Sequence, residues 1–160
     1  MPPRAADLLS PSEAPARRLR RIPAETLPRF DAVILAEARR IEHARRIVTG
    51  WLRRQCRMSK PRAEALEIVV SELCTNAVLH GSASAFGLRG VAYADGAVRL
   101  EVRDGTPCRV PSPQCPGLME ENGRGLFLVD ALVSELDGTW GFSDNGTVAW
   151  CLIPATGEGE

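Results

Sequence analysis

The chain has 160 residues, the size of a single domain, and its hydrophobic share of 44% is enough to form a core. Its 20 basic and 20 acidic side chains cancel, which removes any global reason to expect nucleic acid or an anionic membrane as partner. No apolar stretch approaches the roughly 20 residues of a membrane span, and the N-terminus lacks the apolar region of a signal peptide. A cytoplasmic location is therefore expected.

The five cysteines do not follow a metal-binding or disulfide pattern. Their gaps are wide, no CxxC pair occurs, and His43 and His80 do not complete the spacing of a metal site. We expect reduced thiols, most of them buried as small hydrophobic side chains. Exposure is expected only in a proline-rich stretch, at Cys108 and Cys115.

Composition divides the chain into three parts. Residues 1–27 are rich in proline and arginine, so a disordered tail is expected there. Residues 28–154 carry the periodic patterns of an ordered domain. Residues 155–160 are expected to fray.

The first half of the domain predicts one strand and two helices. Residues 30–35 are apolar and partly β-branched, which favours a short strand. Residues 37–55 carry apolar side chains from Ala38 onward at spacings of three and four, with arginines opposite, as in an amphipathic helix. Ser59 as N-cap and Pro61 in the first turn predict a second helix to about His80, which Gly81 ends.

The second half predicts two hairpins around a third helix. Strands at residues 88–93 and 97–103 are joined by Asp95-Gly96, and strands at 139–142 and 147–153 flank residues 144–146. The stretch 105–122 has no period, and a loop of that length is usually functional or mobile. Residues 125–136 are helical. The order predicts the α+β class, a two-layer sandwich with a mixed, mostly antiparallel sheet on about three helices.

Glu72 and Asn76 form the first candidate pair for a functional site. They lie four residues apart on the second predicted helix and therefore share one face. A carboxylate and an amide are unusual choices beside a core-facing apolar stripe. A solvated position at the border of that stripe explains them equally well.

Two turns provide further candidates. At Asp104-Gly105, the carboxylate is suited to accept a hydrogen bond from an exocyclic amine such as that of adenine, and the glycine allows a flat ring to approach. At Gly123-Arg124-Gly125 a loop enters a helix, whose bare N–H groups attract phosphate. Each turn has an ordinary alternative, because Asp-Gly commonly ends a strand and a lone GxG is a weak signal. Neither a Walker P-loop nor a dinucleotide fingerprint fits.

In this order, the pieces resemble the nucleotide-binding domain that gyrase-type, histidine-kinase and mismatch-repair ATPases share, the GHKL type. The matching boxes are IVVSELCTNAVLHG at 68–81, EVRDGTP at 101–107 and ENGRGLFLV at 121–129, followed by Gly146-Thr147. The most specific part is SELCTNAVLHG. Residues 28–154 look most like the small anti-sigma-factor serine/threonine kinases and related actinobacterial ATP-binding regulators.

The resemblance implies an ATP site that uses Mg²⁺. Asn76 would ligate the Mg²⁺ that neutralises the phosphates, and Glu72 would be the catalytic base or would orient a water. Asp104 would bind the adenine amine with support from Thr147, and residues 105–122 would form the lid. Other nucleotide-binding positions implied by the match are Gly105, Gly123, Arg124, Gly125, Leu126 and His80, although His80 fits a structural role at the helix end equally well.

Two departures from the family pattern bear on activity. The usual second box is Asp-x-Gly-x-Gly, whereas this chain has Asp104-Gly105 followed by Thr106-Pro107, so the hinge glycine of the lid is missing. Many of the sigma-regulating kinases place an arginine two residues before the first glycine of the third box, where this chain has Glu121. These departures weaken the expectation of kinase activity more than that of ATP binding.

The resemblance implies a kinase that phosphorylates a serine or threonine on an anti-sigma antagonist protein and binds a sigma factor, with no direct nucleic-acid or membrane contact. A homodimer is left open. The alternatives are an ATP-binding module that switches partners without phosphorylating them, and a detached histidine-kinase-like ATPase domain. A fourth is an α+β domain with coincidental motifs.

Overall fold

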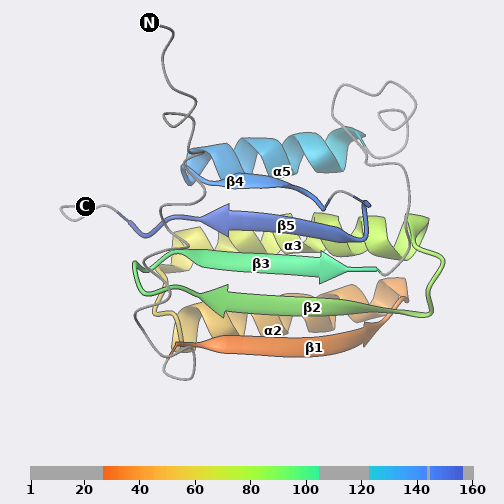
Figure 1. Ribbon diagram of the computed structural model, residues 1–160, viewed down its shortest axis with the longest axis horizontal. Coiled ribbons are helices and arrows are strands. Elements are labelled where there is room, and N and C mark those ends of the chain that lie inside the picture. The colour runs from red at the N-terminus through yellow and green to blue at the C-terminus, as the bar shows by residue number, and fades with distance from the viewer. Residues whose placement is uncertain (1–26, 105–122, 144, 157–160) are drawn as a thin grey trace, which may run out of the picture.

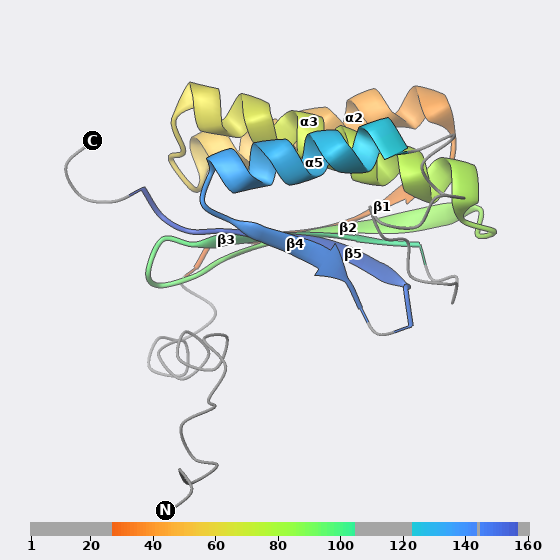
Figure 2. The same cartoon turned by 90° about the horizontal axis from the view of Figure 1, so that it is seen from above.

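A computed structural model describes residues 27–104, 123–143 and 145–156, and these form a two-layer α+β sandwich (Figures 1 and 2). Three α-helices lie side by side on one face of a five-stranded sheet, and no described helix covers the other face. This confirms the predicted class and order of elements. The elements are β1 (Arg29–Leu35), the 3₁₀ turn η3 (Ala38–Arg40), α2 (Ile41–Arg54), α3 (Lys60–His80), β2 (Ala85–Ala92), β3 (Val98–Arg103), α5 (Gly123–Glu135), β4 (Thr139–Phe142) and β5 (Val148–Ile153).

The strands follow the order β1-β2-β3-β5-β4, and each pairing among them is antiparallel. The mixed sheet allowed by the sequence is therefore antiparallel throughout the described strands. Both predicted hairpins form, and each turns on a glycine in the left-handed region, Gly96 at φ 87° and Gly146 at φ 74°. Ala97 N–H also donates to the Asp95 carboxylate at 2.9 Å, which fixes the first turn.

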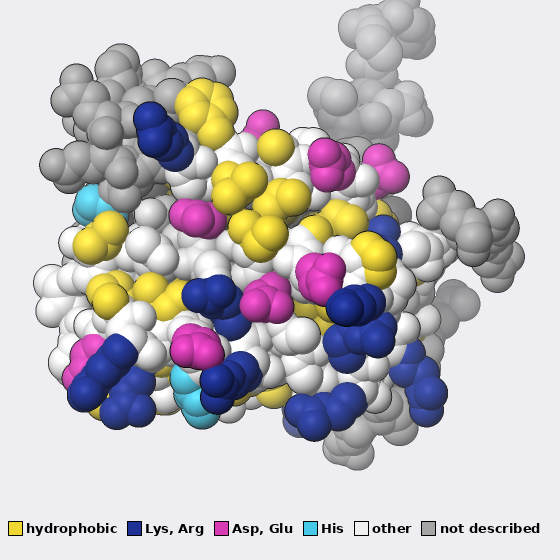
Figure 3. Space-filling model, turned by 180° about the vertical axis from the view of Figure 1, so that it is seen from behind, with side chains coloured by type: hydrophobic (Ala, Val, Ile, Leu, Met, Phe, Trp, Pro, Cys, Tyr) yellow, Lys and Arg dark blue, Asp and Glu magenta, His cyan; other side chains and the backbone are white. Residues whose placement is uncertain are grey.

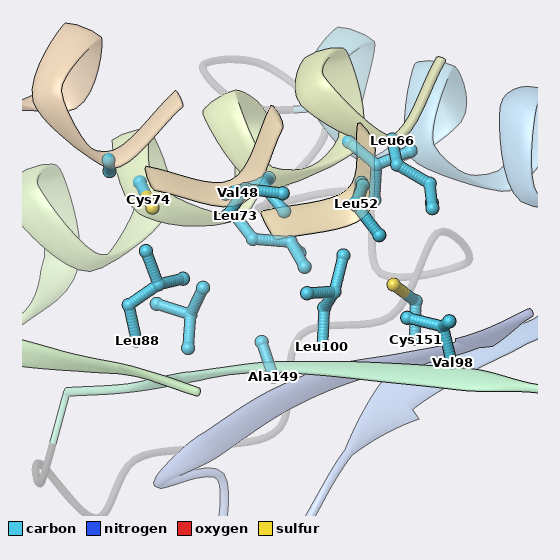
Figure 4. Packing of buried hydrophobic residues seen from close by; sticks show 14 of the residues in the cluster. Val48, Leu52, Leu66, Leu73, Cys74, Leu88, Val98, Leu100, Ala149 and Cys151 are labelled. Carbon is cyan, nitrogen blue, oxygen red and sulfur yellow. The ribbon is translucent and has the colours of Figure 1, made fainter. Parts of the chain in front are cut away.

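The core lies between the sheet and the helix layer. Leu52 of α2 and Leu66 and Leu73 of α3 point toward Leu88 and Leu100 of the sheet (Figure 4). All of these side chains are essentially buried. Because the apolar positions of the strands alternate, one face of the sheet is covered and the other carries the charged residues.

The helix predicted at residues 37–55 is shorter in the structure, where α2 spans Ile41–Arg54. Glu37 has an extended backbone, residues 38–40 form a 3₁₀ turn, and the α-helix begins only at Ile41. The Glu37 carboxylate pairs with Arg39 at 2.6 Å and Arg40 at 3.6 Å, and Ala38 is exposed rather than part of the apolar stripe. A short 3₁₀ turn commonly occupies such a helix entrance.

Both ends of α3 differ in detail from the expected caps. Ser59 occupies the N-cap position, but its side chain makes no capping hydrogen bond and only its carbonyl accepts, from Ala63 N–H at 3.0 Å. Gly81 ends the helix at φ −72°, ψ 144°, so the chain leaves extended and not through a left-handed residue. Glycine is needed there because a Cβ would collide with the carbonyl oxygen of Ala77.

Within the described residues, no helix is long and apolar enough to cross a membrane. Cys56, Cys74 and Cys151 are free thiols, and the last two are buried, as expected. Cys108 and Cys115 lie outside the described residues, as do residues 1–26 and 157–160. The expected boundaries of the tails therefore remain predictions.

Candidate functional site

The four sequence boxes meet at one end of the sandwich. The last turns of α3, the end of β3, the start of α5 and the start of β5 lie together at the right of Figure 1. Chain order separates these segments widely, so only the packing of the helices on the sheet brings them together. Their shared location is the first property that a composite binding site requires.

The first and third boxes are in direct contact. A Cβ atom placed on Gly125 would lie 2.6 Å from Oε2 of Glu72 and 3.5 Å from its Cδ. A side chain at position 125 would therefore displace the Glu72 carboxylate from the start of α5, and glycine leaves it in place. The Glu72 carboxylate is thereby held against the turn that carries the bare N–H groups of α5.

The second box lies between the end of α3 and the last hairpin. Asp104 N–H donates to the carbonyl of Thr147 at 3.1 Å, which continues the pairing of β3 with β5 by one residue. A Cβ on Gly81 would lie 3.4 Å from Cβ of Asp104. Asp104 is partly buried. It lies between Thr147, to which its N–H is hydrogen-bonded, and Gly81 at the end of α3.

Thr147 itself is held by its own turn. Its hydroxyl donates to Oδ1 of Asn145 at 2.7 Å, and Oδ1 also receives Thr147 N–H at 3.2 Å and the Ser143 hydroxyl at 3.0 Å. One amide oxygen therefore organises the whole β4–β5 turn. The Thr147 hydroxyl also lies 3.5 Å from that of Ser143, and because a hydroxyl has two acceptor positions it retains at least one for an incoming donor.

Glu72 and Asn76 are both partly buried on α3. In the described part of the chain, neither side chain makes a hydrogen bond or an ion pair. Glu72 also lines an open groove of about 520 Å³ between α2 and α3. A carboxylate that has no partner, is half-buried and reaches a groove is available for chemistry or for a ligand.

Cys74 lies between these two residues but faces the core. Burial raises the pKa of its thiol to about 12. The thiol is therefore protonated at neutral pH and is a packing group, not a nucleophile. This leaves Glu72 as the reactive side chain on this part of α3.

The remaining predicted site residues differ in their exposure to solvent. On α5, Arg124 is exposed and Leu126 is buried. His80 is exposed at the end of α3, where it has an interaction of its own. Gly123 begins α5, two residues earlier than predicted. Gly105, Glu121 and the proposed lid at 105–122 lie outside the described residues.

Sequence reasoning missed two contributors. Gly81 was interpreted as a helix stop at the end of the first box, whereas in the structure it also lies in contact distance of Asp104. Asn145 was interpreted only as part of a turn, although its side chain holds Thr147. The signal for Asn145 was present, since asparagine commonly bonds the main chain two residues ahead.

The comparison with protein families places the chain. A model described as histidine kinase-like ATPase domain matches residues 34–151. The chain belongs to this family. The matched span contains all four boxes and each described site residue. Membership in the histidine kinase-like ATPase domain family supports ATP binding by this domain and a kinase-type, ATP-dependent transfer of a phosphoryl group.

Solved structures similar to this ATPase domain include two from Erythrobacter litoralis EL346. One is the histidine kinase domain of a blue-light activated histidine kinase, with 24% identity and a TM-score of 0.47 over 59% of this chain and 45% of that one. The other is the blue-light activated histidine kinase, with 25% identity and a TM-score of 0.49 over 61% of this chain and 32% of that one. The chain thus spans less than half of either protein. None of the curated proteins compared with it matches.

Asn76 fits the Mg²⁺ that would accompany ATP in this ATPase domain. Mg²⁺ keeps several waters and is usually held by one or two protein oxygens plus phosphates. One amide such as Asn76, which has no partner among the described residues, meets that need. The described residues hold no cluster of three His, Cys, Asp or Glu side chains that could retain a metal without nucleotide. A metal carried in with the phosphates is consistent with such a site.

Proposed function

We propose that the protein is a serine/threonine kinase that phosphorylates an anti-sigma antagonist protein and binds a sigma factor. The observation that carries the proposal is the packing of Gly125 on the Glu72 carboxylate. It holds an unpaired carboxylate beside the helix N-terminus where phosphates are expected. Oriented placement of a base and a phosphate cradle is most of what phosphoryl transfer requires.

In the proposed reaction, the oxygen of a serine or threonine hydroxyl attacks the γ-phosphorus of ATP. Glu72 accepts the hydroxyl proton, the bond to the β-phosphate oxygen breaks, and ADP leaves. Bound Mg²⁺ supplies neutralisation of the phosphate charge. Asn76 would hold the metal, Asp104 would bind the adenine amine, and the N–H groups from Gly123 onward would orient the phosphates.

The decisive test replaces the carboxylate of Glu72 with an amide. Glu72→Gln keeps the shape beside Gly125, so ATP affinity should stay within about twofold of wild type, while transfer falls by about 10²–10⁴ because the base is lost. ATP binding is measured by calorimetry, and transfer with γ-labelled ATP, Mg²⁺ and the antagonist-type proteins of the same genome. Glu64→Gln, two turns earlier on α3 and exposed, is the matched control. Undiminished transfer by Glu72→Gln would sink the assigned role.

A second variant tests the contact itself. Gly125→Ala places a methyl group against the Glu72 carboxylate, which must move away from the start of α5. We expect transfer to fall by about tenfold or more, since small displacements of catalytic groups are costly. The fold should survive, because the clash involves a side chain that has room to turn into the groove. Transfer at the wild-type rate would remove the contact from the proposal.

An alternative is a partner-switching module that binds ATP without transferring phosphate. Glu121 favours it, because related kinases place an arginine at that position to meet the γ-phosphate. ATP affinity together with the absence of transfer to any antagonist would support this alternative. A second alternative, a detached histidine-kinase-like domain, would give an acid-labile phosphohistidine, whereas phosphoserine and phosphothreonine survive acid. The same labelled reactions distinguish these outcomes.

A further inference from the structure

The outward face of the helix layer carries exposed apolar side chains close to Glu72. Ile68 of α3 is 43% exposed, and Phe127 and Leu128 of α5 are 52% and 40% exposed. Figure 3 shows hydrophobic side chains gathered in its upper half, with acidic groups around them, whereas basic side chains dominate the lower half over α2. Soluble monomers seldom leave such a cluster uncovered without a use for it.

Helix geometry places Ile68 and Leu128 on one surface, whereas Phe127, two residues after Gly125, lies on another side of α5. The helices α3 and α5 run in opposite directions in Figure 1, and Gly125 lies against Glu72. One turn later along α5 and one turn earlier along α3, Leu128 and Ile68 reach the same level. The apolar surface therefore begins one helical turn from the carboxylate that we assign as the base.

The groove between α2 and α3 reaches the same carboxylate from the other side. Its volume is about 520 Å³, and both Ile68 and Glu72 line it. Ser71, which also lines it, has a buried hydroxyl without a hydrogen-bond partner among the described residues. Apolar surface and groove thus form one continuous face with Glu72 at its centre.

Charge distinguishes the two walls of the groove. On the α2 wall, Arg39 is paired with Glu37 and Glu42 with Arg46, whereas Arg45 makes no ion pair within the described residues. An unpaired arginine at the edge of a groove is suited to a carboxylate of a partner. The face thus offers an apolar contact on one side of Glu72 and a single positive charge on the other.

We propose that this face, defined by Ile68, Leu128 and Arg45, is where the phosphate-accepting protein docks. The proposal rests on the proposed function and adds the site of its substrate. The partner is a folded protein that places a hydroxyl at Glu72, an apolar side chain over Ile68 and Leu128, and an acidic residue at Arg45. A small-molecule acceptor would not need the apolar cluster, since exposed apolar clusters of that kind are typical of protein interfaces.

The test measures binding of each antagonist-type protein of the same genome to the full chain with Mg²⁺ and ATP by calorimetry. Leu128→Asp and Arg45→Glu should each weaken binding by at least tenfold, because they place a charge opposite an apolar or acidic group. Their affinity for ATP should equal that of wild type. Val33→Asp is the matched control, since Val33 is 81% exposed on β1, away from the helix layer. It should change neither affinity.

Reversal of charge in the partner gives a stricter result. Exchange of one partner carboxylate for lysine should restore binding to Arg45→Glu, which a merely misfolded variant would not show. Normal binding by Leu128→Asp, or weakened binding by Val33→Asp, would overturn the proposal. A wild-type chain that binds ATP but none of these proteins would also overturn it and leave the nucleotide site intact. A chain without affinity for ATP would instead refute the proposed function, while the protein-binding measurements still decide the docking face.

Discussion

The helices α2 and α3 pack side by side on the same sheet but use their sequences differently. α2 buries one stripe, Ala44, Val48, Trp51 and Leu52, and turns an arginine-rich face to solvent. α3 buries a wider stripe than α2, which contains Ala63, Leu66, Val69, Val70, Leu73, Cys74 and Ala77. Its remaining ridge carries the polar residues of the site.

The difference teaches where function is placed in this fold. α3 is enclosed by the sheet below and by α2 and α5 at its sides, so its backbone is held more firmly than that of α2. A catalytic carboxylate gains accuracy from such a rigid support. α2 has the simpler role of covering the sheet, and its outer surface is free to vary or to receive a partner.

The largest effect should come from loss of a side chain at the centre of α3. Leu73 is 1% exposed, and its replacement by alanine should lower the free energy of unfolding by about 2–5 kcal/mol. Ile68→Ala on the same helix, at a position 43% exposed, should cost well under half as much. Urea unfolding followed by circular dichroism gives both values. Equal losses would mean that α3 is not the enclosed helix described above.

The next largest expected effect is a pH dependence of the free energy of unfolding, to which α3 contributes and the buried stripe of α2 does not. Burial raises the pKa of Cys74 from the ordinary 9.0 to about 12, whereas the buried stripe of α2 contains no titrating group. The folded state keeps its proton where the unfolded state loses it, so this contribution is complete below pH 9 and is lost as pH rises from 9 to 12. The loss reaches about 1.4 kcal/mol per pH unit.

Comparison of wild type with Cys74→Ala isolates that contribution. Free energies of unfolding are measured at pH 8.0 and 10.5 under reducing conditions. The decline over this range should be smaller in the variant. Cys151 has the same raised pKa and should leave a residual slope in it. An identical slope in both proteins would show that the Cys74 thiol is not protected by the core.

A smaller effect of opposite sign is expected in α2. A Cβ on Gly50 meets only the guanidinium of Arg54, which is free to swing away. Gly50→Ala should therefore stabilise the protein by about 0.5–1 kcal/mol through reduced freedom of the unfolded chain. Thermal unfolding detects the shift. A loss of stability instead would show that α2 is packed more tightly at this position than its surface suggests.

The smallest effect concerns the outer face of α2. Arg46 and Glu42 form an i,i+4 pair at 2.7 Å with both side chains largely exposed. Arg46→Ala should cost only about 0.3–0.5 kcal/mol, and added salt should reduce the difference. Unfolding at low and high ionic strength measures it. A cost above about 1 kcal/mol would contradict the description of this face of α2 as a solvated surface that contributes little to stability.

Local patterns were sufficient to predict most of the fold. The amphipathic stripe of α2 and the turns at Asp95-Gly96 and Gly146 depend on near neighbours in the chain, and all three are present. The 3₁₀ turn was not predictable, because Ala38 fits the helical spacing and only the pairing of Glu37 with Arg39 shows that the helix starts later.

The site was predictable as a set of residues but not as an arrangement. The spacing of Glu72 and Asn76 follows from one helix. The contact of Gly125 with Glu72 joins two neighbouring helices that are far apart in the sequence, and no local pattern encodes it. The docking face was also invisible, because Ile68 and Leu128 are ordinary apolar positions on two different helices until those helices are packed together.

The route of the chain between β3 and β5 has a consequence for folding and for variation in length. Arg103 pairs with Val148, and Asp104 N–H donates to Thr147, so the two ends of the segment 104–147, which contains α5 and β4, meet at one place in the sheet. Closure of this long loop must precede the pairing of β3 with β5, which makes it a slow, entropy-limited step.

The same closed loop makes insertions inexpensive. Doubling the length of such a loop adds only about 0.6 kcal/mol to its closure entropy, provided that its ends stay together. The stretch 105–122 is therefore free to lengthen or shorten without disturbing the register of the sheet. A single scaffold of this kind therefore tolerates segments of many lengths between β3 and α5, and each length is open to separate selection.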